Sequence, residues 1–358
     1  MIKNTFVASN KSLKQLEDIC KINILSDFSI IHNDYTPYNL QPDVISFLKQ
    51  LPKLIQNQYI NLQLRSFLYD VYFNGSFTSN SLDVNFKNNS LTKTEIIENN
   101  TLRGINRDFY NAICANNNGT GYYDNGWLVL QEKDAETLVV QKDELTLHLK
   151  RNRHLRVREQ SAKLGDKVDV MMPNNLIEYG YYIAVGDAGL AKDKLVNIYF
   201  NFTSHGALLV MESLTKRLNL VGVPFQFKVL NDPEEYGRYD SGVLQFNSLD
   251  YSIIKEELQV IYNQYKPYFS QESPIFTKLL APGLSLAEEP NYKFNNQEDF
   301  GMNRCRIIAN ALIDAWEHGD NSKEVKMAAI RQHFSKLGIV IELPYLNPES
   351  KDIYLLFN

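Results

Sequence analysis

Hydrophobic residues recur at helical spacing near the start of the chain. Leu13, Leu16 and Ile19 form one series, and a longer series follows about 25 residues later. Residues three and four positions apart share one face of a helix. We therefore predict that residues 1–95 form a mostly helical region. The polar tract after Tyr72 predicts a surface loop and the boundary of this region. The longer series consists of Val44, Phe47, Leu48, Leu51, Leu54 and Ile55.

After that tract the spacing changes from helical to alternating. The segments WLVLQEK, ETLVVQKD and ELTLHLKRN alternate apolar with polar residues and are separated by turn-forming residues. This pattern predicts a small antiparallel sheet. The run KRNRHLRVR, at 150–158, carries five Lys and Arg residues in nine positions. It fits either an edge strand that charge protects from aggregation or part of a phosphate-binding surface.

The strongest pattern lies between residues 195 and 246. LVNIYFNF alternates strictly, TSHGALLVMESLTKRLNL has one apolar stripe, and FQFKVL and SGVLQF alternate again. Thr203 or Ser204 can cap the helix, and VGVP ends it. If the flanking strands are parallel neighbours, they form a right-handed strand–helix–strand unit whose helix covers the Phe-rich face. The opposite, polar face would carry Tyr199, Asn201, Gln226 and Lys228.

The last hundred residues predict further helices and short strands. DYSIIKEELQVIYNQYKPYF and NRCRIIANALIDAWEHG are helical, and PIFTKLLAPGLSLAEEP indicates a short helix and a Pro/Gly loop. IVIELPYL and IYLLF indicate strands or extended edges. The predicted fold class is α+β: a helical N-terminal region, 1–95, is followed by a mixed α/β domain, 96–358, with a central twisted sheet.

Composition and charge exclude several classes of protein. A net charge of −5 over 358 residues argues against a protein that coats nucleic acid or anionic lipid. The three cysteines form no CxxC pair, and no apolar run is long enough to span a bilayer. The first 25 residues lack the pattern of a signal peptide. We expect a cytoplasmic protein, or one exported without a cleavable signal, with neither nucleic acid nor membrane as a partner.

Motifs for metal, nucleotide or serine-hydrolase chemistry are absent from the sequence. The six histidines include no HExxH and no pair at i, i+4, so we expect no metal. The glycines match neither GxxxxGK[ST] nor GxGxxG, and there is no GxSxG elbow. We expect chemistry without a cofactor.

Charged residues in two strand-like segments remain as candidates for a functional site. Lys228 interrupts the alternation of FQFKVL, where it is either a surface lysine or a desolvated lysine in a cleft that could serve as a general base. In YGRYD, Tyr236, Arg238 and Asp240 would share one face of an extended segment. That arrangement gives either an arginine held by a carboxylate or one that is available to an anion.

Two further arginines lie near the start of a predicted helix. Arg304 and Arg306 follow the residues FGMN, where the backbone amides of the first turn favour an anion. On an amphipathic helix we expect one of the two to face solvent.

Several segments resemble the Hop-A type III effector family. The most specific are VPFQFKVL, FTKLLAPGLSLAEEP and FGMNRCR, and the resemblance covers about residues 100–320. Some relatives in this family act as the lyase component of class V lanthipeptide synthetases. The family is in turn similar to phosphothreonine lyases, which remove phosphate by β-elimination without a metal or organic cofactor. The resemblance implies a phosphorylated peptide or protein as substrate and leaves open whether a partner kinase supplies the phosphate.

The resemblance also implies roles for individual residues. Lys228 corresponds to the base, and Arg238 and Arg304 correspond to the arginines that bind phosphate. The phosphothreonine lyases use a histidine on the preceding strand as the acid, and NIYFNF has none, so Tyr199 and His205 are the remaining candidates. The missing histidine keeps an alternative open, a non-catalytic effector-like module that binds a partner protein. Supporting positions are Asn201, Tyr236 and Asp240.

Overall fold

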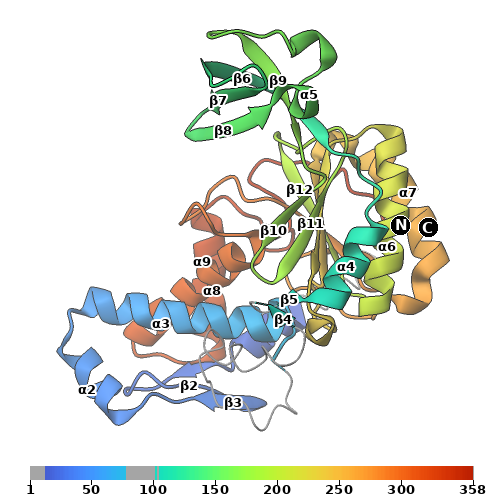
Figure 1. Ribbon diagram of the computed structural model, residues 1–358. Helices are drawn as coiled ribbons and strands as arrows, with labels where there is room; N and C mark the ends of the chain where they lie inside the picture. Colours follow the sequence, from blue (N-terminus) through green and yellow to red (C-terminus); the bar gives the residue numbers. More distant parts are fainter. Residues whose placement is uncertain (1–12, 78–100, 103–104, 358) are drawn as a thin grey trace.

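The computed structural model describes residues 13–77, 101–102 and 105–357 and has an α+β fold (Figure 1). The predicted fold class is therefore confirmed. The predicted boundary between residues 95 and 96, and most of the polar tract after Tyr72, lie outside the described residues.

The N-terminal region is helical, as predicted, but it also contains a small sheet. A helix at 13–19 precedes three antiparallel strands that the hydrophobic spacing does not indicate. In the longer apolar series, Leu48 is buried whereas Phe47 is 60% exposed, so only part of that stripe faces the core. The elements are β1 (Asn23–Ile24), β2 (Ile30–His32), β3 (Tyr35–Tyr38), α2 (Pro42–Gln50), α3 (Lys53–Leu68) and the π-helix η1 (Tyr69–Phe73).

A seven-stranded sheet forms the centre of the molecule, and each strand is antiparallel to its neighbours. The predicted parallel neighbours, β12 and β13, do run parallel, but β14 lies between them and pairs with both. The prediction of adjacent strands was wrong because the chain turns back after β13 and inserts β14 into the gap. In spatial order the strands are β10 (Asn175–Glu178), β11 (Tyr181–Val185), β13 (Phe225–Leu230), β14 (Gly242–Asn247), β12 (Leu195–Phe200), β16 (Leu284–Glu288) and β15 (Lys278–Ala281).

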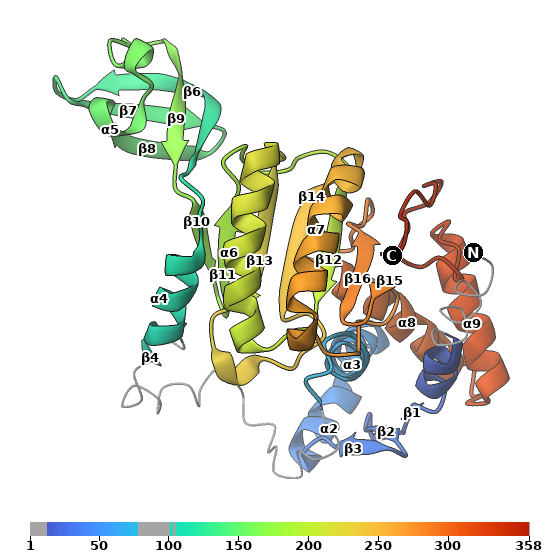
Figure 2. The same cartoon turned by 90° about the vertical axis from the view of Figure 1, so that its right-hand side faces the viewer.

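Helices cover both faces of this sheet. Helices α6 (Ser204–Val221) and α7 (Tyr251–Tyr265) lie side by side over one face (Figure 2), where the phenylalanines of β12 and β13 are buried. The Thr203 hydroxyl caps α6 by accepting from the amide of Gly206, and Gly222, with φ +69°, ends it. Rings from η1 and α8 (Phe300–Glu317) pack against Tyr199 on the opposite face. Two further helices are α4 (Arg107–Asn116) and α9 (Lys323–Lys336).

The predicted small antiparallel sheet forms a separate unit at one end of the molecule (Figure 1). It has its own hydrophobic core around Trp127. The basic run lies at its edge, where β8 ends and a short helix begins. The strands, in spatial order, are β8 (Leu145–Lys150), β7 (Thr137–Lys142), β6 (Tyr122–Glu132) and β9 (Lys167–Met172), and the short helix is α5 (Arg151–His154). The strands β4 (Thr101–Leu102) and β5 (Ile105–Asn106) form a separate two-stranded sheet.

Two predictions for the C-terminal third were wrong. The segment PIFTKLLAPGLSLAEEP forms the hairpin β15–β16 instead of a helix and a loop, because Pro282 and Gly283 make its turn. Gly283 has φ +73°, and a Cβ there would lie 2.2 Å from the Ser270 carbonyl oxygen, so only glycine fits. Within the described residues after 336 the chain forms turns and irregular structure, not the strands expected for IVIELPYL and IYLLF. No described helix combines the length and apolar character that crossing a bilayer requires.

Candidate functional site

Lys228 lies on the face of the seven-stranded sheet that points away from α6. Its ammonium group is 2.7 Å from Oε1 of Glu178 on β10 and 4.0 Å from the centre of the Tyr181 ring on β11. The Lys228 side chain is 28% exposed, and that of Glu178 is 54% exposed. Lys228 is therefore a half-buried lysine on the sheet, held by an accessible carboxylate.

Arg238 and Asp240 form a two-pronged ion pair beside Lys228. Nε and an Nη nitrogen of Arg238 each lie 2.9 Å from a separate oxygen of Asp240, and an Nη nitrogen donates to the Tyr181 hydroxyl at 3.0 Å. This is the arginine held by a carboxylate, one of the two arrangements that the alternation of YGRYD left open. Tyr236 points elsewhere, because its hydroxyl donates to the Leu230 carbonyl at 2.8 Å.

Two aspartates contact a single phenol on the other side of this pair. The Tyr69 hydroxyl lies 3.3 Å from Oδ2 of Asp240 and 3.3 Å from Oδ2 of Asp299. The other oxygen of Asp299 accepts from the Met302 amide at 2.7 Å and caps α8. Asp299 still reaches solvent. Loss of surrounding water raises the pKa of Asp299, the amide of Met302 opposes this, and the negative charge of Asp240 adds to the rise.

These side chains form one connected group, which we name the Lys228 cluster: Lys228, Glu178, Tyr181, Arg238, Asp240, Tyr69 and Asp299. It combines a lysine that could take a proton, an arginine with unused N–H groups for an anion and an exposed carboxyl whose pKa is raised. Such a set can move protons and hold a negative charge without a metal.

Tyr199 and Asn201 belong to the same face but lie deeper. On the neighbouring strands Lys228 pairs with Val243, and Val243 pairs with Tyr199. Lys228 and Tyr199 are therefore separated by two strand spacings, or about 10 Å. The Tyr199 ring packs edge-on against Phe73, and burial raises the pKa of its hydroxyl well above the usual value. Asn201 is buried and donates to the Glu272 carbonyl at 3.1 Å.

Two candidates from the sequence lie outside the Lys228 cluster. His205 is exposed at the start of α6, on the far face of the sheet, and its ring contacts Tyr268. Arg304 is 1% exposed and donates to the carbonyls of Pro344 at 2.9 Å and Leu346 at 3.3 Å. Burial lowers its pKa to about 10. Arg304 therefore joins α8 to the C-terminal segment. Arg306 pairs with Glu298 rather than facing solvent.

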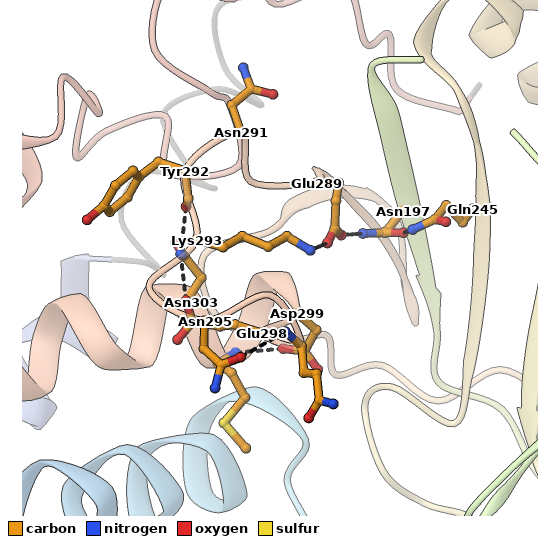
Figure 3. A network of polar contacts seen from close by, with 12 residues as sticks. Asn197, Gln245, Glu289, Asn291, Tyr292, Lys293, Asn295, Glu298, Asp299 and Asn303 are labelled. Atoms are coloured by element: carbon orange, nitrogen blue, oxygen red, sulfur yellow. Dashed lines mark hydrogen bonds and ion pairs between the residues drawn. The ribbon is translucent and has the colours of Figure 1, made fainter. Parts of the chain in front are cut away.

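A row of amide side chains lies on the same face of the sheet. Figure 3 shows Gln245 and Asn197 from this row, together with Glu289 and Lys293. Gln226 donates to Gln245 at 2.7 Å, Gln245 donates to Asn197 at 2.9 Å, and Asn197 donates to Glu289 at 2.6 Å. Lys293 pairs with the other oxygen of Glu289. This amide ladder starts two residues from Lys228 on β13 and ends near Asp299, whose pKa Glu289 also raises.

Hollows and possible metal ligands lie elsewhere in the described part of the chain. A cavity of about 590 Å³ lies between the four-stranded sheet and the loop around Leu190. Asp18, His32 and Asp34 lie close together, but Nε2 of His32 faces Asp18 and Nδ1 faces Asp34. Lys21 already neutralises Asp18 at 2.6 Å. One ion could not use both ring nitrogens, so this group is a poor metal site.

The basic run at 150–158 is mostly engaged within the four-stranded sheet. Arg151 pairs with Glu132 at 2.8 Å, and Arg156 pairs with Asp169 at 3.3 Å while stacking on Tyr123. It lies apart from the Lys228 cluster (Figure 1).

Sequence reasoning missed four members of the Lys228 cluster. Glu178, Tyr181 and Tyr69 give no local signal, because their partners lie 50 or more residues away in the chain. Asp299 had a usable signal, since an aspartate directly before the helical run FGMNRCR is a typical N-cap.

Comparison with known proteins confirms the family resemblance. Residues 172–346 match the model of the HopA1 effector protein family. An effector protein structure from Pseudomonas syringae pv. tomato strain DC3000 is 17% identical, with a TM-score of 0.41, over 68% of this chain and 81% of that one. An effector protein structure from Pseudomonas syringae pv. syringae strain 61 is 16% identical, with the same TM-score and coverage. No curated protein matches the chain.

Proposed function

Residues 172–346 belong to the HopA1 effector protein family, and from this premise we propose that the chain eliminates phosphate from phosphothreonine or phosphoserine in a peptide or protein. The observation that carries the proposal is that Lys228 and Arg238 both contact Tyr181. The Lys228 ammonium is 4.0 Å from the ring centre, and Arg238 donates to the hydroxyl. A base and a phosphate-binding cation are thus within reach of one substrate residue.

In this reaction Lys228, as a neutral amine, takes the proton from Cα, and the electrons of that bond form the Cα=Cβ double bond. The Cβ–O bond breaks, and the leaving phosphate is held by Arg238. Glu178 pairs with Lys228 in the substrate-free chain, so substrate binding must displace this exposed carboxylate. The leaving oxygen takes up a proton from an acid in the site, so that the products are a dehydroamino acid and hydrogen phosphate. Such a product is the precursor of a lanthionine bridge, which suits peptide maturation.

The second candidate is a protein-interaction module without catalysis. It is favoured by the pairing of both cations with carboxylates, Lys228 with Glu178 and Arg238 with Asp240, which leaves the cluster without excess positive charge for a phosphate. In this case the same face would bind a partner protein.

Mass spectrometry of a panel of phosphothreonine and phosphoserine peptides distinguishes the two candidates. We expect loss of phosphoric acid from at least one peptide, and no loss with Lys228→Met. Lys278→Met is the matched control, because Lys278 is also a partly buried strand lysine, paired with Asp352 at 2.6 Å and lying near the Tyr345 ring. Unchanged masses across the panel would favour the interaction module.

A further inference from the structure

The contacts of Tyr69 limit where a proton can lie in the Lys228 cluster. A phenol has one proton, and two aspartate oxygens lie 3.3 Å from the Tyr69 hydroxyl. Either the phenol shares its proton between the two oxygens, or the second carboxyl carries a proton of its own and donates it to the phenol oxygen.

Asp240 is the ionised member of this pair. Both of its oxygens accept from Arg238 at 2.9 Å, an arrangement that requires the carboxylate form. With Asp240 ionised, the second of these arrangements has Tyr69 donating to Asp240 and Asp299 donating to Tyr69. Oδ2 of Asp299 is the oxygen available for the proton, because Oδ1 accepts from the amide of Met302.

The charge balance around the cluster favours the same assignment. Lys228 and Arg238 supply two positive charges, and Glu178 and Asp240 already cancel them. An ionised Asp299 would add a negative charge beside Asp240 and would repel a phosphate. The pKa of Asp299 is shifted upward, which is the direction that this assignment requires.

We propose that Asp299 is the general acid of this site and that Tyr69 positions it; this inference rests on the proposed elimination. As the Cβ–O bond breaks, Oδ2–H of Asp299 gives its proton to the oxygen that leaves with the phosphate. Lys228 ends as an ammonium and Asp299 as a carboxylate, and exchange with water restores both. Asp299 thereby takes the role of general acid, for which the strand NIYFNF has no histidine.

The variant Asp299→Asn tests the assignment without removing the helix cap, because asparagine caps helices as well as aspartate does. The measurement is the rate of phosphate elimination between pH 5 and 9 for the full chain. We expect a loss of about 10²-fold or more at neutral pH, the usual contribution of general acid catalysis. We also expect that the wild-type rate falls at high pH as Asp299 ionises and that this fall is absent in the variant. Tyr69→Phe should reduce the rate less than Asp299→Asn does.

Equal rates and pH profiles for wild type and Asp299→Asn would overturn the assignment while leaving the lyase function intact. If the wild-type chain eliminates no phosphate, the proposed function fails, and urea unfolding at several pH values still decides where the proton lies. A raised pKa means that the folded chain binds the proton more tightly than the unfolded chain does. Wild type should therefore lose stability relative to Asp299→Asn as pH rises through the folded-state pKa. A pH-independent difference would overturn the inference.

The matched control is Asp320→Asn, an aspartate outside the cluster whose pKa is lowered by the backbone amide of Ser322. Its pH dependence must have the opposite sign. The stability that Asp320 contributes is present above the usual aspartate pKa and is lost as pH falls through its lowered pKa. This variant should eliminate phosphate at the wild-type rate.

Discussion

Replacement of Arg304 by methionine separates a structural arginine from a phosphate ligand. Methionine fills a similar volume but cannot donate, so the carbonyls of Pro344 and Leu346 and the side-chain oxygen of Asn303 each lose a bond, of 2.9, 3.3 and 2.6 Å respectively. A hydrogen bond from a charged donor contributes about 1.5 kcal/mol or more, which gives roughly 4–5 kcal/mol for three. Relief of the buried charge offsets part of this, so we expect a loss of about 3 kcal/mol in the free energy of unfolding.

Urea unfolding followed by circular dichroism measures this loss. Arg331→Met is the control, because Arg331 is 49% exposed and pairs with Glu342 at the surface, where such a pair contributes about 0–1 kcal/mol. The folded fraction of Arg304→Met should retain elimination activity. A variant as stable as wild type that has lost activity would refute the structural role of Arg304 and restore it as a phosphate ligand.

Two further predictions concern the edge strand and the hairpin turn. Glu178→Ala should accelerate elimination, because the substrate no longer has to displace the carboxylate that pairs with Lys228 at 2.7 Å. An unchanged rate would show that this pair does not restrain the base. Gly283→Ala should destabilise the fold by about 2 kcal/mol more than Gly180→Ala does, since both glycines have positive φ but only a Cβ at 283 would collide with Ser270. Equal unfolding midpoints for these two variants would contradict the steric argument.

The sequence predicts the local parts of this fold and site well. Alternation identified β12, β13 and β14, and the spacing in YGRYD offered the pairing of Arg238 with Asp240 as one of two arrangements, because both patterns depend on neighbours in the chain. It could not predict that β14 inserts between β12 and β13, since strand order depends on which edges remain open as the sheet forms.

Long-range contacts explain what the sequence left open in the site. Tyr69 meets Asp240 and Asp299 across 171 and 230 residues. The spacing of charged residues carries no information about such distances. Arg304 is a case in which a local signal misled. Its position at the start of a helix suggested that it binds an anion, but its N–H groups donate to carbonyls of the C-terminal segment.

The amide ladder has a built-in polarity. A carboxylate can only accept, so Glu289 requires the NH₂ group of Asn197 to face it, and this in turn orients the amides of Gln245 and then Gln226. One charge thus sets the direction of three dipoles across three strands. If Glu289 were replaced by a donor, each amide would have to exchange the positions of its oxygen and its NH₂ group. The dipoles in the row that begins on the strand of Lys228 would then all be reversed.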